Sequence, residues 1–159
     1  MPDMSSSSHD NLVLATRRLR EAIDDALLTE DPVSVMWVRL HPVSGIQKEL
    51  GADVADAALA YLQEALADAL PHAQIHPLMD DEVLVIIPGA DRSQAEICQE
   101  QAEDFLTQHP LVLTNVDGKG DCLEVRLRID SGLAFYPDDG DDAETVAQRA
   151  FRESQRERS

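Results

Sequence analysis

The stretch Ile75-His-Pro-Leu-Met-Asp-Asp-Glu-Val-Leu-Val-Ile-Ile-Pro88 contains two short apolar runs on either side of three consecutive carboxylates. The second run, residues 83–87, is unbroken and rich in β-branched side chains, which is typical of a strand buried on both faces. The stretch therefore predicts a strand, a sharp acidic turn and a second strand. An acidic tip on a rigid strand is suited to hold Mg²⁺ and a polyphosphate, although a plain polar loop has the same composition.

The residues around this stretch alternate between apolar strands and amphipathic helices. An almost wholly apolar strand follows Pro32, at residues 33–40, and this composition indicates a central place in a sheet. Residues 111–113 and 123–129 predict a hairpin, whose second strand alternates strictly between apolar and polar residues. Apolar positions at three- and four-residue steps predict helices at residues 10–28, at 53–70, after a capping box formed by Asp91 and Gln94, and from about Ala143 onward.

Length and charge limit the classes of function. The chain has 159 residues, enough for one domain with its own core, and 13 basic against 31 acidic residues give a net charge of −18. Nucleic-acid binding is excluded, because phosphate contacts need clustered Lys and Arg. No apolar run approaches the length of a membrane span, the N-terminus lacks the order of a signal peptide, and Cys98 and Cys122 are too few for a disulfide framework. We expect a cytoplasmic protein with no membrane contact.

The order of the elements and their landmarks resemble the GGDEF domain, the bacterial diguanylate cyclase family. The landmarks are the strand at 33–40, the turn Met79-Asp-Asp-Glu-Val83, the segment Ser131-Gly-Leu-Ala134 and the acidic lead into the last helix. The resemblance covers residues 32–158. It implies an α+β, nucleotide-cyclase-like (ferredoxin-like palm) fold with a central, mostly antiparallel five-stranded sheet flanked by helices. An N-terminal amphipathic helix at 10–29 and a disordered lead-in at 1–9 precede this domain.

The resemblance also implies where catalytic groups would lie. Cyclases of the family condense two GTP molecules into cyclic di-GMP, with two Mg²⁺ ions between an aspartate at the end of the first strand and the acidic turn. Arg39 takes the place of that aspartate, so a permanent cation stands where the metal is held. Three candidate nucleotide contacts remain: Gln47 replaces a base-reading Asn, Asp56 is a retained base-reading Asp, and Arg158 replaces a phosphate-contacting Lys.

The signature turn departs from the family pattern as well. Gly-Gly-Asp-Glu-Phe is replaced by Met79-Asp80-Asp81-Glu82-Val83. The paired glycines let the backbone approach the triphosphate, whereas Met79 adds bulk and Asp80 adds a negative charge facing phosphate. Asp81 and Glu82 keep the family's metal ligand and acid–base group, although two acids at an exposed hairpin tip need no such role. The family's product-inhibition motif lacks its polar ends here.

These departures predict a degenerate GGDEF domain, a pseudoenzyme that serves as a regulatory or protein-interaction module in bacterial cyclic di-GMP signalling. Arg39, Asp80, Asp81 and Glu82 are then vestigial active-site positions, and we expect no catalytic residue, no metal site and no cofactor. Two alternatives stay open. One is a divergent active diguanylate cyclase that uses Mg²⁺ and GTP, and the other is a sensor that binds GTP without turnover.

A domain without catalytic activity acts through the molecules that it binds, so its binding partners decide its role. We expect a protein of the signalling pathway, or a second copy bound through the N-terminal helix. The apolar stripe of that helix packs either on its own sheet or against that copy, and it consists of Leu12, Leu19, Ile23 and Ala26. We also expect Arg39 to pair with Asp81, or failing that with Asp80, so that an ion pair replaces the metal.

Overall fold

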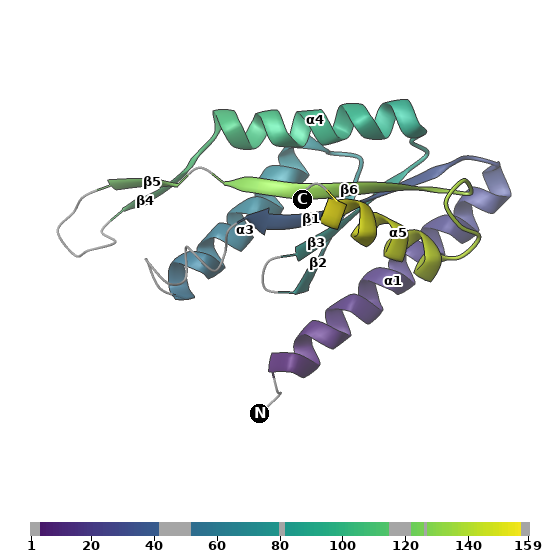
Figure 1. Ribbon diagram of the computed structural model, residues 1–159, viewed down its shortest axis with the longest axis horizontal. Helices are drawn as coiled ribbons and strands as arrows, with labels where there is room; N and C mark the ends of the chain where they lie inside the picture. The colour runs from purple at the N-terminus through teal and green to yellow at the C-terminus, as the bar shows by residue number, and fades with distance from the viewer. Residues whose placement is uncertain (1–3, 42–51, 80–81, 115–121, 126, 157–159) are drawn as a thin grey trace.

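The computed structural model describes residues 4–41, 52–79, 82–114, 122–125 and 127–156. Helices and strands alternate along the chain much as the sequence predicts (Figure 1). In chain order they are α1 (Met4–Thr29), β1 (Val33–His41), α3 (Ala52–Ala69), β2 (Gln74–Met79), β3 (Glu82–Pro88), α4 (Arg92–Gln108), β4 (Leu111–Thr114), β5 (Cys122–Val125), β6 (Arg128–Tyr136) and α5 (Ala143–Arg156). The short helical turn expected before Gly51 lies outside the described residues. No helix in the described part of the chain is long and apolar enough to cross a membrane.

The main sheet has four strands in the order β2-β3-β1-β6, and each neighbouring pair is antiparallel. The pairing places Arg39 of β1 opposite Glu82 of β3 and opposite Asp130 of β6. The α+β class and the antiparallel sheet flanked by helices are therefore confirmed. The fifth strand that we expected in this sheet instead belongs to the separate hairpin β4–β5, which extends away from it in Figure 1.

The prediction for residues 123–129 was wrong in detail, because one strand was expected there and the structure has two. Strand β5 ends at Val125, and β6 begins at Arg128 and runs across Gly132 to Tyr136. Leu127, between them, is buried in the core with α4. Apolar and polar residues alternate through this break just as they do within a strand. This two-residue alternation therefore does not show where the chain leaves one sheet and enters another.

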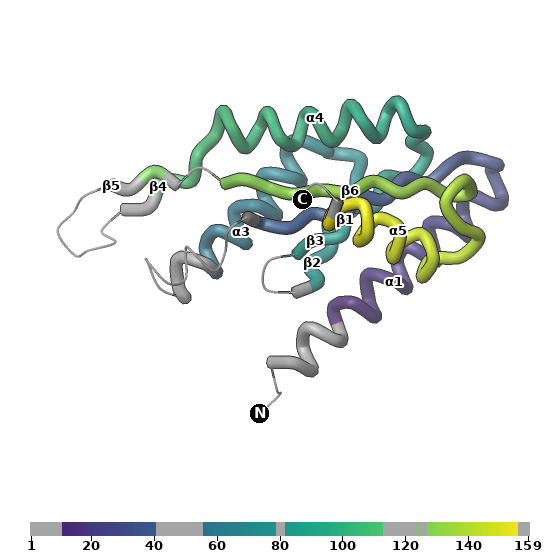
Figure 2. The backbone as a smooth tube through the Cα atoms, in the orientation of Figure 1, coloured from purple at the N-terminus to yellow at the C-terminus, as the bar shows by residue number. Residues whose placement is uncertain are grey.

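Two apolar cores lie on the two faces of the main sheet, and alternate residues of each strand supply them. Met36, Val38 and Leu40 of β1 contact the core under α3 and α4, while Val33, Val35 and Trp37 contact the core under α1 and α5. Figure 2 shows α4 along one side of the sheet and α1 with α5 on the other. This explains why β1 and β3 are almost wholly apolar: both of their faces are covered.

The apolar stripe of α1 is covered by the chain's own sheet and by α5. Ala15 and Leu19 are fully buried in that core, together with Ile23 and Ala26. The helix begins at Met4 rather than at Asp10, so part of the lead-in expected to be disordered is helical. Extending a helix by one residue costs far less than nucleating it, so the packed part of α1 supports this N-terminal extension.

His76 of β2 lies on the face that α1 covers. Burial lowers its pKa first, and the positive charge of Arg18 on α1 lowers it further. A folded-state pKa below the unfolded value of 6.5 means that the unfolded chain takes up the proton more readily. The stability that depends on neutral His76 is therefore complete above pH 6.5 and decreases as the pH falls through that value.

We expect His76→Gln to lose less stability than the parent chain when the pH is lowered from about 7.5 to about 5.5. Urea unfolding at both pH values measures this difference. His72→Gln is the matched control, since His72 is exposed just before β2. If His76→Gln shows the same loss as the parent chain, the half-buried histidine does not limit stability in acid.

Candidate functional site

The ends of β1 and β3 bring together two of the residues that the sequence singles out. Arg39 and Glu82 are register partners, and their side chains lie on the face of the sheet that α1 and α5 cover. The distance from Arg39 Nε to Glu82 Oε1 is 3.7 Å. The Glu82 side chain is 6% exposed and that of Arg39 is 24% exposed, so the pair is largely withdrawn from solvent.

A second group holds the carboxylate of Glu82 from the core side. Trp37, two residues before Arg39 on the same face of β1, donates a hydrogen bond from Nε1 to Glu82 Oε2 over 3.2 Å. The indole ring packs against Phe151 of α5, with ring centroids 5.1 Å apart. Both oxygens of Glu82 are therefore engaged, one by an indole N–H and one by a guanidinium group.

This arrangement meets the requirements of a buried carboxylate. A buried carboxylate is stable only when it is paired and hydrogen-bonded, and Glu82 has both kinds of partner. The cluster of Trp37, Arg39 and Glu82 joins the ends of two central strands to α5 through Phe151.

The other candidate residues from the sequence are not brought to this cluster by the described structure. Asp56 lies on α3 with an exposed side chain. Gln47, Asp80, Asp81 and Arg158 lie outside the described residues, and so does the expected pairing of Arg39 with Asp81 or Asp80. Within the part of the chain that the structure describes, no three His, Cys, Asp or Glu side chains gather to hold a metal ion, and the absence of a metal site stays a prediction.

The sequence and the fold were next compared with known proteins. The profile of the family described as "Diguanylate cyclase, GGDEF domain" matches residues 10–158. The chain belongs to the GGDEF family. No curated protein sequence matches the chain. The GGDEF match begins within α1, so α1 is continuous with the matched domain in sequence as well as in packing.

Solved GGDEF domains have the same fold. The GGDEF domain of YfiN (TpbB) from Pseudomonas aeruginosa is 20% identical, with a TM-score of 0.81 over 90% of this chain and 86% of that one. A sensory box/GGDEF family protein from Caulobacter crescentus is 25% identical, with a TM-score of 0.73 over 89% and 87%. The diguanylate cyclase SiaD from P. aeruginosa, solved with its activator SiaC, is 14% identical, with a TM-score of 0.78 over 91% and 53%.

The residues that the structure describes at the ends of β1 and β3 do not fit the family's Mg²⁺. The GGDEF resemblance places a metal-binding aspartate where this chain has Arg39, and the guanidinium group lies beside Glu82. Oxygen ligands around Mg²⁺ need near-ideal octahedral geometry, and a fixed cation at 3.7 Å from one carboxylate oxygen opposes it. We therefore derive no catalytic step through a metal at this position.

Trp37 is the one member of the cluster that the sequence analysis missed. It was interpreted only as part of an apolar strand, although an indole N–H needs an acceptor when it is buried. The available signal was its spacing of two from Arg39, which places both side chains on one face of β1. The acceptor could not be named without the register between β1 and β3.

Proposed function

We propose that this GGDEF domain is catalytically silent and acts in cyclic di-GMP signalling by binding a protein partner. The single observation that carries the proposal is the contact between Arg39 and Glu82. By the resemblance to the family, this built-in cation takes the position where active relatives would hold a metal ion. The same carboxylate that would serve chemistry is instead held by Arg39 and Trp37.

Electrostatics supports the loss of catalysis. Metal ions and positioned donors normally supply most of the transition-state stabilisation in phosphoryl transfer. A guanidinium group can offset charge, but it cannot coordinate the attacking hydroxyl and the phosphate oxygens together as a divalent ion does. The Met79-Asp80 pair in place of two glycines adds bulk and negative charge at the turn.

A GGDEF domain without catalytic activity can still act by binding another protein. SiaD, which shares the fold, was solved in complex with its activator SiaC, so a GGDEF domain can belong to an assembly with another protein. The large negative charge of this chain, −18, favours partners that present basic groups.

We expect no cyclic di-GMP when the full chain is incubated with GTP and either Mg²⁺ or Mn²⁺. Mass spectrometry of the reaction mixture measures the product, and an active diguanylate cyclase assayed in parallel is the positive control. Product that forms with this chain and is lost in Asp81→Ala would overturn the proposal, because Asp81 is one of the two acids of the signature turn that this chain retains.

Calorimetric titration of the chain with GTP and with cyclic di-GMP, with and without Mg²⁺, distinguishes a domain that binds no GTP from a sensor that binds GTP without turnover. We expect no saturable heat with GTP. Saturable GTP binding without turnover, weakened in Asp56→Ala, would instead favour the nucleotide sensor.

A further inference from the structure

The outer face of α1 carries most of the large apolar side chains that the described part of the chain leaves exposed. Six such side chains are exposed among the described residues, and four of them lie on this helix. They form two pairs, Val13 with Leu14 and Leu27 with Leu28, and Leu28 is 86% exposed. Single exposed apolar residues are normal on a protein surface, whereas four on one helix indicate a contact surface.

The two apolar pairs lie on the side of α1 that faces away from the sheet. They are fourteen residues apart, which is about four helical turns, so both pairs lie on the same side of the helix. Ala15 and Leu19 lie on the opposite side and are fully buried in the core with α5. Figure 2 shows α1 on the outside of the sheet, on the side away from α4. The described chain therefore covers one face of α1 and leaves the other exposed.

Two opposite charges lie on this outer face between the apolar pairs. Arg17 comes one turn after the first pair, and Asp24 comes one turn before the second. Both side chains are exposed, and within the described residues neither has a hydrogen-bond or ion-pair partner. Arg20 and Glu21, which lie between them, are each paired within the chain. The charges that α1 can offer to another molecule are therefore those of Arg17 and Asp24.

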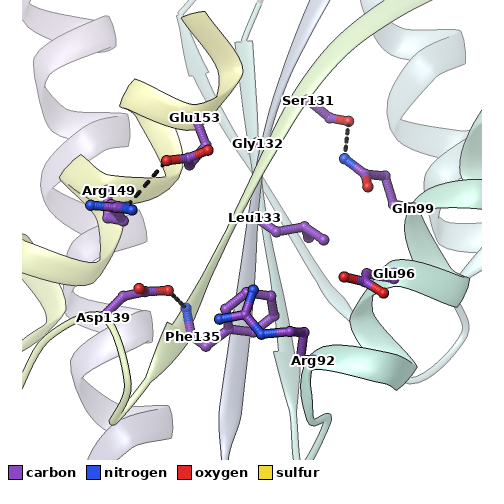
Figure 3. Close-up of a pocket in the computed structure, with 10 residues that line it drawn as sticks. All are labelled: Arg92, Glu96, Gln99, Ser131, Gly132, Leu133, Phe135, Asp139, Arg149 and Glu153. Carbon is purple, nitrogen blue, oxygen red and sulfur yellow. Dashed lines mark hydrogen bonds and ion pairs between the residues drawn. The ribbon is translucent and has the colours of Figure 1, made fainter. Parts of the chain in front are cut away.

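The hollow beside β6 is a weaker candidate for a contact surface. It has a volume of about 400 Å³ between α4 and α5, and charged groups on its walls are held within the chain (Figure 3). Arg149 Nε is 3.2 Å from Glu153 Oε1, and Asp139 Oδ2 accepts a hydrogen bond from the N–H of Phe135 over 2.8 Å. A partner in this hollow would have to displace these contacts, whereas the outer face of α1 needs no such change.

We propose that a second copy of this chain binds the outer face of α1, with the two α1 helices antiparallel. The first apolar pair of each helix then contacts the second pair of the other helix, and Arg17 of each copy faces Asp24 of the other. The midpoint between the two apolar pairs and the midpoint between Arg17 and Asp24 coincide, between residues 20 and 21. One two-fold axis therefore satisfies all of these contacts, and each contact occurs twice.

Charge decides the direction of the second helix. In a parallel pair Arg17 would face Arg17 and Asp24 would face Asp24, so both contacts would be repulsive. In the antiparallel pair both contacts are attractive. An anionic membrane surface fits this face less well, because Asp24 lies at its centre and the chain has a net charge of −18. The inference goes beyond the proposed function, since contact between two α1 helices requires neither catalytic silence nor a different protein.

Sedimentation velocity of the full chain at rising concentration tests the proposal. A contact between two single helices is small, so we expect a reversible dimer with a dissociation constant of about 10 µM. Leu28→Ser should weaken the dimer by about tenfold or more, because Leu28 takes part twice in the interface. Ile97→Ser is the matched control, since Ile97 is an exposed apolar side chain on α4, and it should leave the dimer unchanged.

Exchange of the two charges tests the antiparallel direction. Arg17→Asp places two carboxylates opposite each other in both contacts, and it should weaken the dimer by about tenfold or more. Adding Asp24→Arg exchanges the two charges, so the doubly substituted chain should regain the affinity of its parent. Arg152→Asp makes the same charge change at an exposed position of α5 and should have no effect. Thermal unfolding checks that the fold is kept, because every substituted side chain is exposed.

Three results would overturn the proposal. The first is a chain that stays monomeric at all concentrations, which would leave this face to a different protein. The second is a dimer that Leu28→Ser and Arg17→Asp weaken no more than their controls do. The third is a dimer that Arg17→Asp weakens and the charge exchange does not restore, since Arg17 would then not face Asp24.

Discussion

Gly132→Ala is expected to destabilise the fold by about 3 kcal/mol or more, which corresponds to a fall in Tm of roughly 6–12 °C. A Cβ atom at Gly132 would lie 2.6 Å from the carbonyl carbon of Glu153 and closer still to Ser154 N and Ala150 O. All three atoms belong to the main chain of α5, so no side-chain rotation relieves the overlap. The helix must move away from the sheet, and the core it shares with α1 opens.

Urea unfolding of the variant and its parent measures this loss. Gly140→Ala is the matched control, because the added Cβ there meets the side chain of exposed Thr145, at 2.7 Å from Cγ2, rather than a main-chain atom. We expect that variant to lose about 1 kcal/mol or less. A loss at Gly132 no larger than the loss at Gly140 would show that α5 does not pack as closely on β6 as the structure has it.

Gly132 also explains why part of the fold could not be predicted from the sequence. The strands at 33–40 and 83–87, the helix at 53–70 and the capping box at Asp91 were predicted within one or two residues, because each has a strong local pattern. In a local sequence pattern, a glycine inside a strand predicts that the strand is interrupted there. It is needed in β6 for the close approach of α5, and that contact joins segments about twenty residues apart.

The candidate site was predicted as a place but not as a set of contacts. The sequence put Arg39 at the end of a central strand and opposite the acidic turn, and the register of β1 and β3 confirms this placement. The carboxylate that the structure shows beside it is Glu82. The predicted pairing with Asp81 or Asp80 lies outside the described residues. The contact with Glu82 was not predicted, because it depends on the register of β1 and β3, and the sequence does not contain that information locally.

Glu82→Ala is the other substitution with a large expected effect. It leaves the buried N–H of Trp37 without its acceptor and the guanidinium group of Arg39 without this carboxylate. Removing one member of a buried, hydrogen-bonded pair costs about 3 kcal/mol. We expect this loss in urea unfolding, together with weaker packing of Trp37 on Phe151 that a shift in tryptophan fluorescence would report.

Glu82→Gln separates the two interactions, since the amide oxygen can still accept from Trp37 while the ion pair is lost. We expect it to cost about 1 kcal/mol, because the guanidinium group is 24% exposed and water partly replaces the carboxylate. Arg39→Asp is the opposite change, and it puts a carboxylate between its register partners Glu82 and Asp130. Three acids at neighbouring strand positions repel one another, so this variant should unfold at lower urea than its parent and recover stability with millimolar Mg²⁺. If Arg39→Asp leaves stability unchanged and insensitive to Mg²⁺, the guanidinium group does not replace the metal ion in this domain.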